Sequence, residues 1–187
     1  MSRSPLSAPW PAHLTTPRLL LRPVEAQDVP VISRLWTDPE VRRHLGGPVG
    51  AAEVAARERL CVGLLGVFAV VRYEGEEKGE GEGAAVMGLV SVETDTRRGS
   101  RAEVSYQLLP EFWGLGYAGE AVARAVTWVL DHVSVGPPSV VAMTQEANTR
   151  SRRLLERIGM RAVDTFVEFD APQVMYSVDR TALRAPE

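Results

Sequence analysis

Three glycines near the middle of the chain mark a turn that could bind an anion. They stand at positions 114, 116 and 119 of the segment Trp-Gly-Leu-Gly-Tyr-Ala-Gly-Glu-Ala, residues 113–121. An alternating strand pattern ends just before this segment, and an amphipathic helical pattern begins inside it. The first N–H groups of a helix lack intrahelical partners and lie at the positive end of its dipole. Because Gly114, Gly116 and Gly119 carry no side chains, the turn is suited to cradle a pyrophosphate.

The glycines alone also permit two other interpretations. A tight turn can need glycine simply because its backbone adopts positive φ angles. The spacing Gly114-x-Gly116-x-x-Gly119 also matches the dinucleotide-binding fingerprint, whose first glycine directly follows a strand in a parallel β–α–β unit. Here the first glycine is the fifth residue after Leu109, and about forty residues follow Glu146, the candidate ribose-binding acid. We therefore disfavour dinucleotide binding and keep the tight turn as the alternative.

Hydrophobic periodicity places this turn in a mixed sheet protein. Asn148 and Gly159 have the residue types of a helix N-cap and a helix end. The expected fold class is α/β (α+β), with a mixed, mostly antiparallel central sheet of about seven strands and flanking helices. The expected strands cover residues 16–23, 67–73, 85–94, 101–109, 139–144, 163–169 and 174–179. One helix is expected to start at Asp28, and three others are expected over residues 51–65, 117–132 and 148–157.

The strand expected over residues 101–109 puts two sets of side chains on opposite faces of the sheet. One set is Glu103, Ser105 and Gln107, and the other is Val104, Tyr106 and Leu108. Before this strand, residues 74–83 consist of Gly, Glu and Lys alone. That composition indicates a solvated hairpin loop rather than a binding tail.

Length and charge limit the classes of protein to which the chain can belong. The 187 residues fit one domain, which we expect over residues 14–182 after a disordered, Pro- and Ser-rich tail over 1–13. A net charge of −3 gives no support for nucleic-acid binding. The longest apolar stretch, residues 60–71, is shorter than the roughly 18 residues of a membrane span. The tail also lacks the apolar segment of a signal peptide.

Cysteine and histidine usage favours neither a disulfide nor a metal site. The single cysteine, Cys61, lies among apolar residues, which indicates a small buried hydrophobe rather than a nucleophile. A cytoplasmic location is the natural expectation for such a chain. His13, His44 and His132 are far apart in sequence, and no Cys, His and carboxylate spacing predicts a metal ligand set.

Three separated segments together resemble the GNAT N-acetyltransferases. The cofactor motif of that family, (Gln/Arg)-x-x-Gly-x-(Gly/Ala), matches residues 113–118 except that Trp113 stands in the first position. The complete run over 113–121 resembles the ribosomal-protein-alanine (Rim-type) branch. So do Thr-Pro-Arg-Leu-Leu-Leu-Arg-Pro over 16–23 and Asn-x-x-Ser-x-x-Leu-Leu-Glu-Arg-Ile-Gly-Met over 148–160. The resemblance covers about residues 15–180 and implies the GNAT acyl-CoA N-acyltransferase fold.

The resemblance implies a role for particular residues in binding acetyl-CoA as co-substrate. Backbone groups of Gln107, Leu108 and Leu109 would pair with the pantetheine arm like an added strand. Asn148 would contact the pantetheine amides while also capping its helix, and Ser151 would lie near the thioester sulfur or the pantetheine. Arg152 or Arg153 would reach a CoA phosphate, unless the basic helix face is simply solvated. The pyrophosphate would be held by the backbone N–H groups of Gly114, Leu115, Gly116, Tyr117, Ala118 and Gly119.

Catalytic roles follow from the same resemblance. Glu103 would be the general base, acting directly or through water, and a backbone N–H near Leu108 would stabilise the oxyanion. Many family members donate a proton to the leaving thiolate from a tyrosine at the position of Leu155, and leucine cannot do so. Ser151, Tyr106 and Tyr117 remain as donors, and Ser151 is the one we place with Glu103 among the catalytic residues.

Two functions remain open at this point. The first is an N-acetyltransferase acting on a primary amine by direct attack in a ternary complex. A protein N-terminus, an amino acid, a polyamine or an amine-bearing antibiotic would be acceptors, and the Rim-type resemblance favours ribosomal-protein N-termini. The second is a catalytically silent acyl-CoA sensor. Acceptor contacts are expected from residues 36–48 and 169–174, which include Asp38, Glu40 and Asp170, and a homodimer is plausible.

Overall fold

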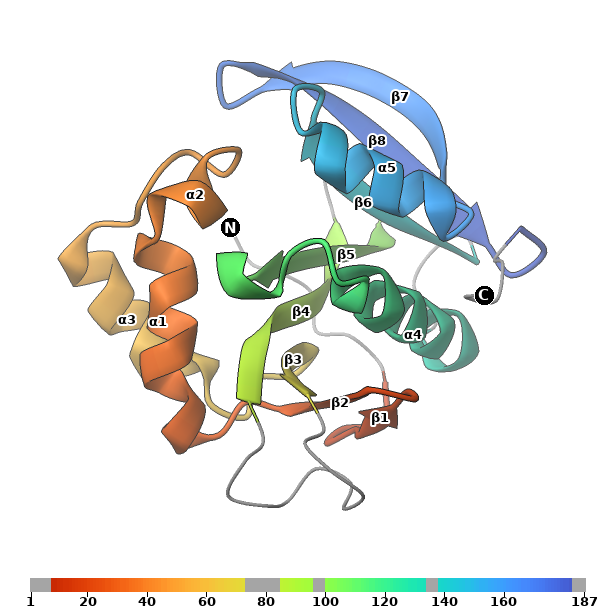
Figure 1. Ribbon diagram of the computed structural model, residues 1–187. Coiled ribbons are helices and arrows are strands. Elements are labelled where there is room, and N and C mark those ends of the chain that lie inside the picture. Colours follow the sequence, from red (N-terminus) through yellow and green to blue (C-terminus); the bar gives the residue numbers. More distant parts are fainter. Residues whose placement is uncertain (1–7, 73–84, 96–99, 134–137, 183–187) are drawn as a thin grey trace.

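One eight-stranded sheet organises the part of the chain that the computed structural model describes, residues 8–72, 85–95, 100–133 and 138–182. Its strand order is β1-β2-β3-β4-β5-β6-β8-β7 (Figure 1). The strands are β1 (Leu14–Thr15), β2 (Leu19–Pro23), β3 (Val67–Arg72), β4 (Ala85–Asp95), β5 (Arg101–Leu108), β6 (Ser139–Gln145), β7 (Arg161–Glu168) and β8 (Ala171–Asp179). The helices are α1 (Val29–Thr37), α2 (Pro39–Arg42), α3 (Ala51–Cys61), α4 (Tyr117–His132) and α5 (Thr149–Arg157).

The sheet is antiparallel except where β5 meets β6. Those two strands run parallel and pair over two positions, Ala102 with Val140 and Glu103 with Val141. Beyond Glu103, β5 continues beside β4 as far as Leu108, whereas β6 continues beside β8. The two strands therefore part after Glu103 and leave a gap in the sheet on the side where β5 ends.

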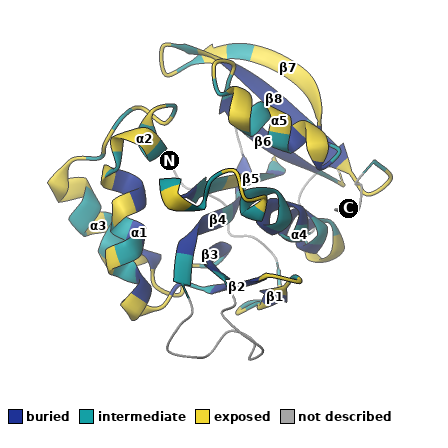
Figure 2. Ribbon diagram, viewed as in Figure 1, coloured by how far each residue is buried: buried dark blue, intermediate teal, exposed yellow. Residues whose placement is uncertain are grey.

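Helices cover both faces of the sheet. On one face, α4 and α5 bury a core that includes Val104, Val126, Leu155 and Tyr176. On the other face, Leu35 of α1 and Cys61 of α3 pack with Ala69 and other apolar side chains of β2, β3 and β4. Figure 2 shows α4 and the central strands largely buried, while β7, at the edge of the sheet, is largely exposed. The mixed fold predicted from the sequence is confirmed.

Local sequence signals account for the ends of the helices beside the gap. Gly116 precedes α4 in the left-handed region, at φ +83°. The Asn148 side-chain oxygen accepts a 3.2 Å hydrogen bond from the Ser151 N–H and so caps α5. Gly159, at φ +95°, ends α5 as predicted.

Several element boundaries differ from those predicted. The described chain has eight strands rather than seven, because β1 precedes the predicted strand over 16–23, and a turn closed by the Thr16 N–H and the Leu19 carbonyl separates it from β2. α2 was not predicted, since its four residues are too few to show a helical period. α3 ends at Cys61 because Gly63 adopts φ +64°. The loop predicted over residues 74–83 lies outside the described residues.

Part of the segment predicted to be a disordered tail packs on the core. Trp10 donates a 3.1 Å hydrogen bond to the Gly63 carbonyl and meets the Phe68 ring edge-on at 5.0 Å. The Trp10 ring is partly buried against this core, so residues 8–13 pack on it despite their Pro-rich composition. Residues 1–7 lie outside the described residues.

Candidate active site

The glycine turn adopts the conformation that its residue types require. Gly114 and Gly116 have φ angles of +78° and +83°, so both positions favour glycine for conformational reasons. Gly119 has no such angle, and an added Cβ there would meet no described atom within 4 Å. Leu115 at the tip of the turn is 53% exposed. The first turn of α4 is thus open on its outer side, and its N–H groups can donate hydrogen bonds to an anion.

The inner side of the turn is closed by residues from the start of the chain. Arg18 donates from Nη1 to the Leu115 carbonyl at 3.1 Å and from Nε to the Glu120 carboxylate at 2.7 Å. The Thr16 hydroxyl donates to the same carboxylate at 2.5 Å. The Arg18 guanidinium also lies 4.6 Å from the centre of the Tyr117 ring. These contacts join two of the sequence segments that carried the family resemblance.

Backbone direction along β5 decides which peptide groups face the gap. The Leu109 N–H donates to the Met87 carbonyl at 2.9 Å, and a Cβ added at Gly88 would lie 2.1 Å from the Gln107 carbonyl oxygen. Gln107 and Leu109 therefore turn their backbone groups toward β4. Since successive residues of an antiparallel strand alternate in direction, Leu108 faces the gap. This argues against the predicted pairing of Gln107 and Leu109 with a pantetheine arm and leaves Leu108.

A side-chain hydrogen bond and a buried side-chain oxygen lie at the same end of β5. The Trp113 indole donates a 2.7 Å hydrogen bond to the Leu108 carbonyl, which holds the glycine turn against the strand. The Gln107 side-chain oxygen is buried and has no hydrogen-bond partner among the described residues. A buried acceptor without a partner is costly. Gln107 is thus a polar group that a bound molecule could satisfy through its side chain.

The three candidate proton donors lie in different surroundings. The Tyr106 hydroxyl meets the Ser151 hydroxyl at 2.7 Å, which links β5 to the first turn of α5 across the gap. Burial raises the pKa of Tyr106 to about 12, although the Ser151 hydrogen bond opposes part of this rise. Tyr117 lies instead under the Arg18 guanidinium. The structure thus brings Tyr106 and Ser151 together and places Tyr117 with Arg18.

The predicted base lies on the other face of β5. Glu103 stands opposite Glu93 in the register of β4 and β5, and the neighbouring pair is Ser91 with Ser105, whose hydroxyls meet at 2.8 Å. This face is turned away from Val104 and the α4 core. Glu103 also marks the closed end of the gap, because β5 and β6 stop pairing there. A group in the gap could therefore contact Tyr106 on one face of the sheet and the polar side chains of Glu103 and Ser105 on the other.

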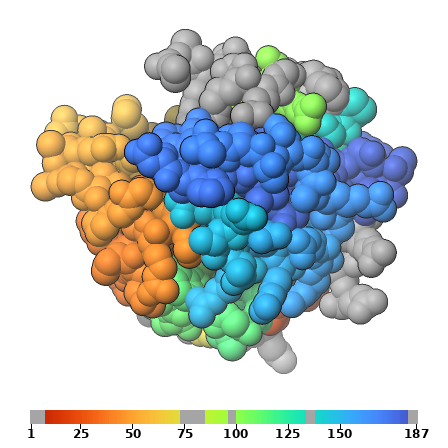
Figure 3. Space-filling model, turned by 90° about the horizontal axis from the view of Figure 1, so that it is seen from above, coloured from red at the N-terminus to blue at the C-terminus, as the bar shows by residue number. Residues whose placement is uncertain are grey.

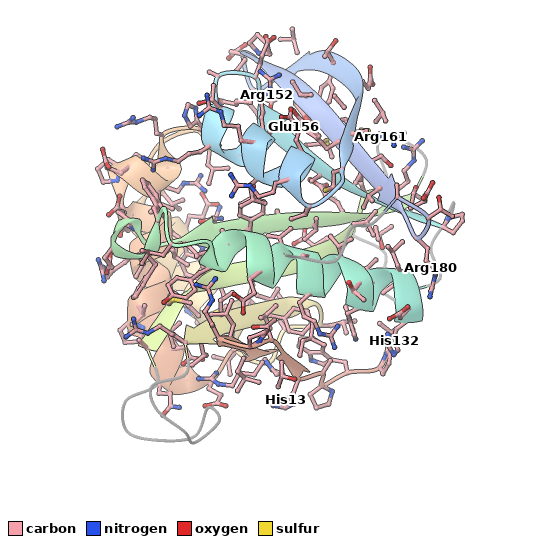
Figure 4. The ribbon with its side chains drawn as sticks, turned by 45° about the vertical axis from the view of Figure 1, so that its right-hand side comes forward. His13, His132, Arg152, Glu156, Arg161 and Arg180 are labelled. Carbon is pink, nitrogen blue, oxygen red and sulfur yellow. The ribbon has the colours of Figure 1, made fainter. Side chains whose placement is uncertain are left out.

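The arginines of α5 take different directions. Arg152 donates to the Tyr176 hydroxyl at 3.2 Å and to the Glu146 carbonyl at 3.3 Å, and Tyr176 in turn donates to Glu156 at 2.8 Å. Figure 4 shows Arg152 and Glu156 together on α5, beside β8. Arg150, in contrast, lies 4.8 Å above the Trp113 ring. Arg150 is therefore the α5 arginine in contact with the glycine turn, whereas the sequence pointed to Arg152 or Arg153.

The regions predicted to contact an acceptor are partly explained by structural roles. The Asp38 carboxylate caps α2 through the Glu40 and Val41 N–H groups, and Glu40 pairs with Arg43. His44, beyond α2, lies 3.2 Å from the Gln145 side chain at the end of β6. Figure 3 shows the region of α2 and α3, in orange and yellow, beside the β7–β8 hairpin in blue. The two regions that were expected to contact an acceptor thus lie near one another.

In the described ranges, no three His, Cys, Asp or Glu residues are grouped so that they could hold a metal ion. Nor does any helix of those ranges have the length and apolar character needed to cross a membrane.

Comparisons of the sequence with known proteins point to one family. The family model described as an acetyltransferase (GNAT) domain matches residues 18–161. An uncharacterized N-acetyltransferase of Bacillus licheniformis, p20, is 26% identical over 155 residues, which cover 79% of this chain and 82% of that protein. The FsC-acetyl coenzyme A-N(2)-transacetylase of Aspergillus fumigatus is 28% identical over 180 residues, which cover 89% of this chain and 76% of that protein.

Solved structures share the fold. An acetyltransferase of the GNAT family from Bacillus anthracis superposes with a TM-score of 0.72 at 20% identity, covering 89% of this chain and 98% of its own. The aminoglycoside acetyltransferase AAC(6')-Ib, solved in complex with coenzyme A, gives 0.64 at 15% identity, with coverages of 88% and 96%. At these identities the likeness concerns the arrangement of the elements.

Proposed function

This chain belongs to the acetyltransferase (GNAT) family and is an acyltransferase, and we propose that it transfers the acetyl group of acetyl-CoA to a primary amine. The observation that carries the proposal is the gap between β5 and β6, which opens beside the exposed N-terminus of α4. This places an unpaired strand edge and an anion cradle next to each other. Acetyl-CoA presents the matching chemistry, an extended amide-containing arm joined to a pyrophosphate.

The residues present fit such a co-substrate. The N–H groups from Gly114 to Gly119 would hold the pyrophosphate on the open side of the turn. The Leu108 N–H would pair with the pantetheine arm or the thioester oxygen, since its backbone faces the gap. The Asn148 side-chain oxygen caps α5, which leaves its NH₂ group to donate to a pantetheine amide. Arg150, above Trp113, would approach a CoA phosphate.

The chemistry proposed is direct aminolysis of the thioester. A neutral amine attacks the carbonyl carbon, the Leu108 N–H stabilises the oxyanion, and the carbon–sulfur bond then breaks. Leu108 lies five positions after Glu103, about 17 Å along an extended strand, so Glu103 would accept the amine proton through a chain of several waters. The Tyr106 hydroxyl, held by Ser151, would donate a hydrogen bond to the sulfur as it leaves. Glu103, Tyr106 and Ser151 thus form the proposed catalytic set.

The acceptor is proposed only as a primary amine. A protein N-terminus, as the Rim-type resemblance suggests, and a small-molecule amine both fit. The name of the Aspergillus relative describes an N-transacetylase that uses acetyl coenzyme A, and the AAC(6')-Ib structure is that of an aminoglycoside acetyltransferase. We further propose that residues 14–182 form a single catalytic domain that works in the cytoplasm.

Calorimetric titration with acetyl-CoA tests the proposed function. Wild type should bind saturably, and Gly116→Glu should lose binding, because its side chain adds negative charge and φ strain to the cradle. Gly63→Glu is the matched control, since Gly63 also has a positive φ, +64°, and a Cβ there would meet no described atom within 4 Å. It should bind as wild type does. Failure of wild type to bind would overturn the proposal.

A thiol-release screen with varied amines then separates an enzyme from a silent sensor. Wild type should release CoA with at least one primary amine. Glu103→Gln should still bind acetyl-CoA but turn over about 10²-fold more slowly, within the range for loss of a general base. Binding by wild type without release for any amine would favour the sensor.

A further inference from the structure

We propose that Arg18 is a positioning residue for the pyrophosphate of CoA, because it orients the Leu115–Gly116 peptide from behind the glycine turn. The proposal rests on the proposed function, since it takes the turn to be a pyrophosphate cradle. It assigns a role in cofactor recognition to an arginine at the start of the chain, far in sequence from the turn itself.

Arg18 is held by contacts on three sides. Its Nη1 donates to the Leu115 carbonyl at 3.1 Å, and its Nε and Nη2 both lie 2.7 Å from one oxygen of Glu120. Its guanidinium plane covers the Tyr117 ring at 4.6 Å. A guanidinium with this many partners has a fixed position, even though 47% of the side chain is exposed.

The contact with Leu115 sets the direction of the next N–H group. In a trans peptide the C=O and the following N–H point in opposite directions. Because the Leu115 carbonyl points at Arg18, the Gly116 N–H points to the opposite, open side of the turn. An added Cβ at Gly116 would lie 3.3 Å from Arg18 Nη2, so the guanidinium packs directly behind this residue. Arg18 therefore keeps the Gly116 N–H turned toward the place where the pyrophosphate would lie.

Arg18 also neutralises a carboxylate that would otherwise repel the pyrophosphate. Glu120 lies in the first turn of α4, and its side chain is 11% exposed. One of its oxygens accepts from the Thr16 hydroxyl at 2.5 Å and from the Arg18 backbone N–H at 3.0 Å, while the other accepts from the Arg18 side chain. Both oxygens are thus directed to the inner side of the turn and matched by a positive charge.

The test compares the binding of CoA with that of pantetheine, which lacks the pyrophosphate. Calorimetry would use wild type, Arg18→Met and the matched control Arg180→Met. Arg180 makes the same types of contact at the other end of α4, with the Leu130 carbonyl and the Asp131 carboxylate, and Figure 4 shows it beside that end of the helix. Arg18→Met should weaken CoA binding at least tenfold and leave pantetheine binding within twofold, whereas Arg180→Met should change neither.

Arg18→Lys provides a second variant if Arg18→Met does not fold. Lysine keeps the charge and the aliphatic stem but cannot reach Leu115 and Glu120 together in the arginine geometry. Its CoA affinity should fall between those of wild type and Arg18→Met. In turnover assays both variants should raise KM for acetyl-CoA and leave kcat within twofold.

Three outcomes would overturn the proposal. An equal loss of affinity for CoA and pantetheine in Arg18→Met would show that Arg18 only maintains the fold. Unchanged CoA affinity would show that the Leu115–Gly116 peptide keeps its orientation without Arg18. Absence of CoA binding by wild type would show that the glycine turn does not bind a pyrophosphate. Failure of the catalytic proposal alone is distinguishable, because wild type would then bind CoA yet release no thiol with any amine. The comparison of CoA and pantetheine affinities would still test the role of Arg18.

Discussion

At the scale of single residues, the Tyr106 and Ser151 hydroxyls offer a replacement for the tyrosine that many family members have at the position of Leu155. Leu155 is fully buried at 0% exposure, so it serves the α5 core and carries no proton to a leaving group. Tyr106 reaches the first turn of the same helix from β5 and meets Ser151. A phenol from the strand thus lies next to the helix from which many family members supply a tyrosine.

We predict that Tyr106→Phe lowers kcat about tenfold and leaves KM for acetyl-CoA little changed, because the hydrogen bond to sulfur matters as the bond breaks. The hydroxyl donates in its protonated form, and burial raises the pKa of Tyr106 to about 12. The ratio of wild-type to variant kcat should therefore stay constant from about pH 6 to pH 10, well below that pKa. Steady-state kinetics over this range check both statements.

Tyr117→Phe is the control for this prediction. It removes a phenol from the neighbourhood of the glycine turn but leaves the Tyr106–Ser151 contact in place, so kcat should remain within twofold of wild type. If the two variants lost the same activity, or if only Tyr117→Phe lost activity, the assignment of Tyr106 would be wrong.

At the scale of elements, the cap of α5 combines two roles that one substitution can separate. Asn148→Asp keeps an oxygen that can accept from the Ser151 N–H, but it removes the NH₂ donor proposed for pantetheine. We expect unchanged thermal stability and acetyl-CoA affinity reduced about fivefold to tenfold, the size of one lost hydrogen bond. Differential scanning fluorimetry and calorimetry measure the two effects.

Asn148→Ala completes the comparison, because it removes both the cap and the donor. It should lower the free energy of unfolding by about 1 kcal/mol as well as weaken binding. Acetyl-CoA affinity in Asn148→Asp equal to that of wild type would mean that Asn148 is only a helix cap.

Helices and strands long enough to repeat their hydrophobic pattern were predictable from the sequence, and shorter ones were not. α4 carries several turns of apolar spacing, and its limits, Tyr117 and His132, agree with the prediction. β1 has two residues and α2 has four, so neither repeats often enough to show a pattern. The direction of the backbone groups along β5 could not be predicted from the sequence either. It depends on the register with β4, which placed Leu108 rather than Gln107 and Leu109 toward the gap.

At the scale of the whole molecule, a buried ion pair ties the start of the sheet to the first helix. Arg22 and Asp28 make two hydrogen bonds, at 2.6 and 2.9 Å, and their side chains are 10% and 2% exposed. Removing one member of a buried pair leaves the other charge without compensation, at about 3–5 kcal/mol. Asp28→Asn should therefore lower the melting temperature by about 10 °C for a chain of this size.

Asp131→Asn is the control, because it breaks the exposed pair with Arg180, whose side chains are 38% and 66% exposed. Exposed pairs contribute about 0–1 kcal/mol, so the melting temperature should move by no more than about 3 °C. Equal shifts in the two variants, measured by scanning calorimetry, would contradict the difference in burial on which the prediction depends.

The site illustrates what sequence can and cannot specify at this scale. The glycine turn and the α5 cap are contiguous segments, so residue types along the chain identified them. The partnerships of Arg18 with Glu120 and of Tyr106 with Ser151 join positions 102 and 45 residues apart. They depend on how the helices pack on the sheet, which no local pattern encodes. Arg150 was likewise named only as one member of a basic helix face.

The interruption between β5 and β6 has a consequence for how the protein avoids self-association. An unpaired strand edge usually invites a strand from another molecule and so promotes aggregation. Here the unpaired edge of β5 lies inside the sheet, because β6, β8 and β7 continue beyond the gap. A strand of another molecule cannot approach this edge from the side, because those three strands occupy that side. The position of this edge therefore protects the molecule against polymerisation by strand addition.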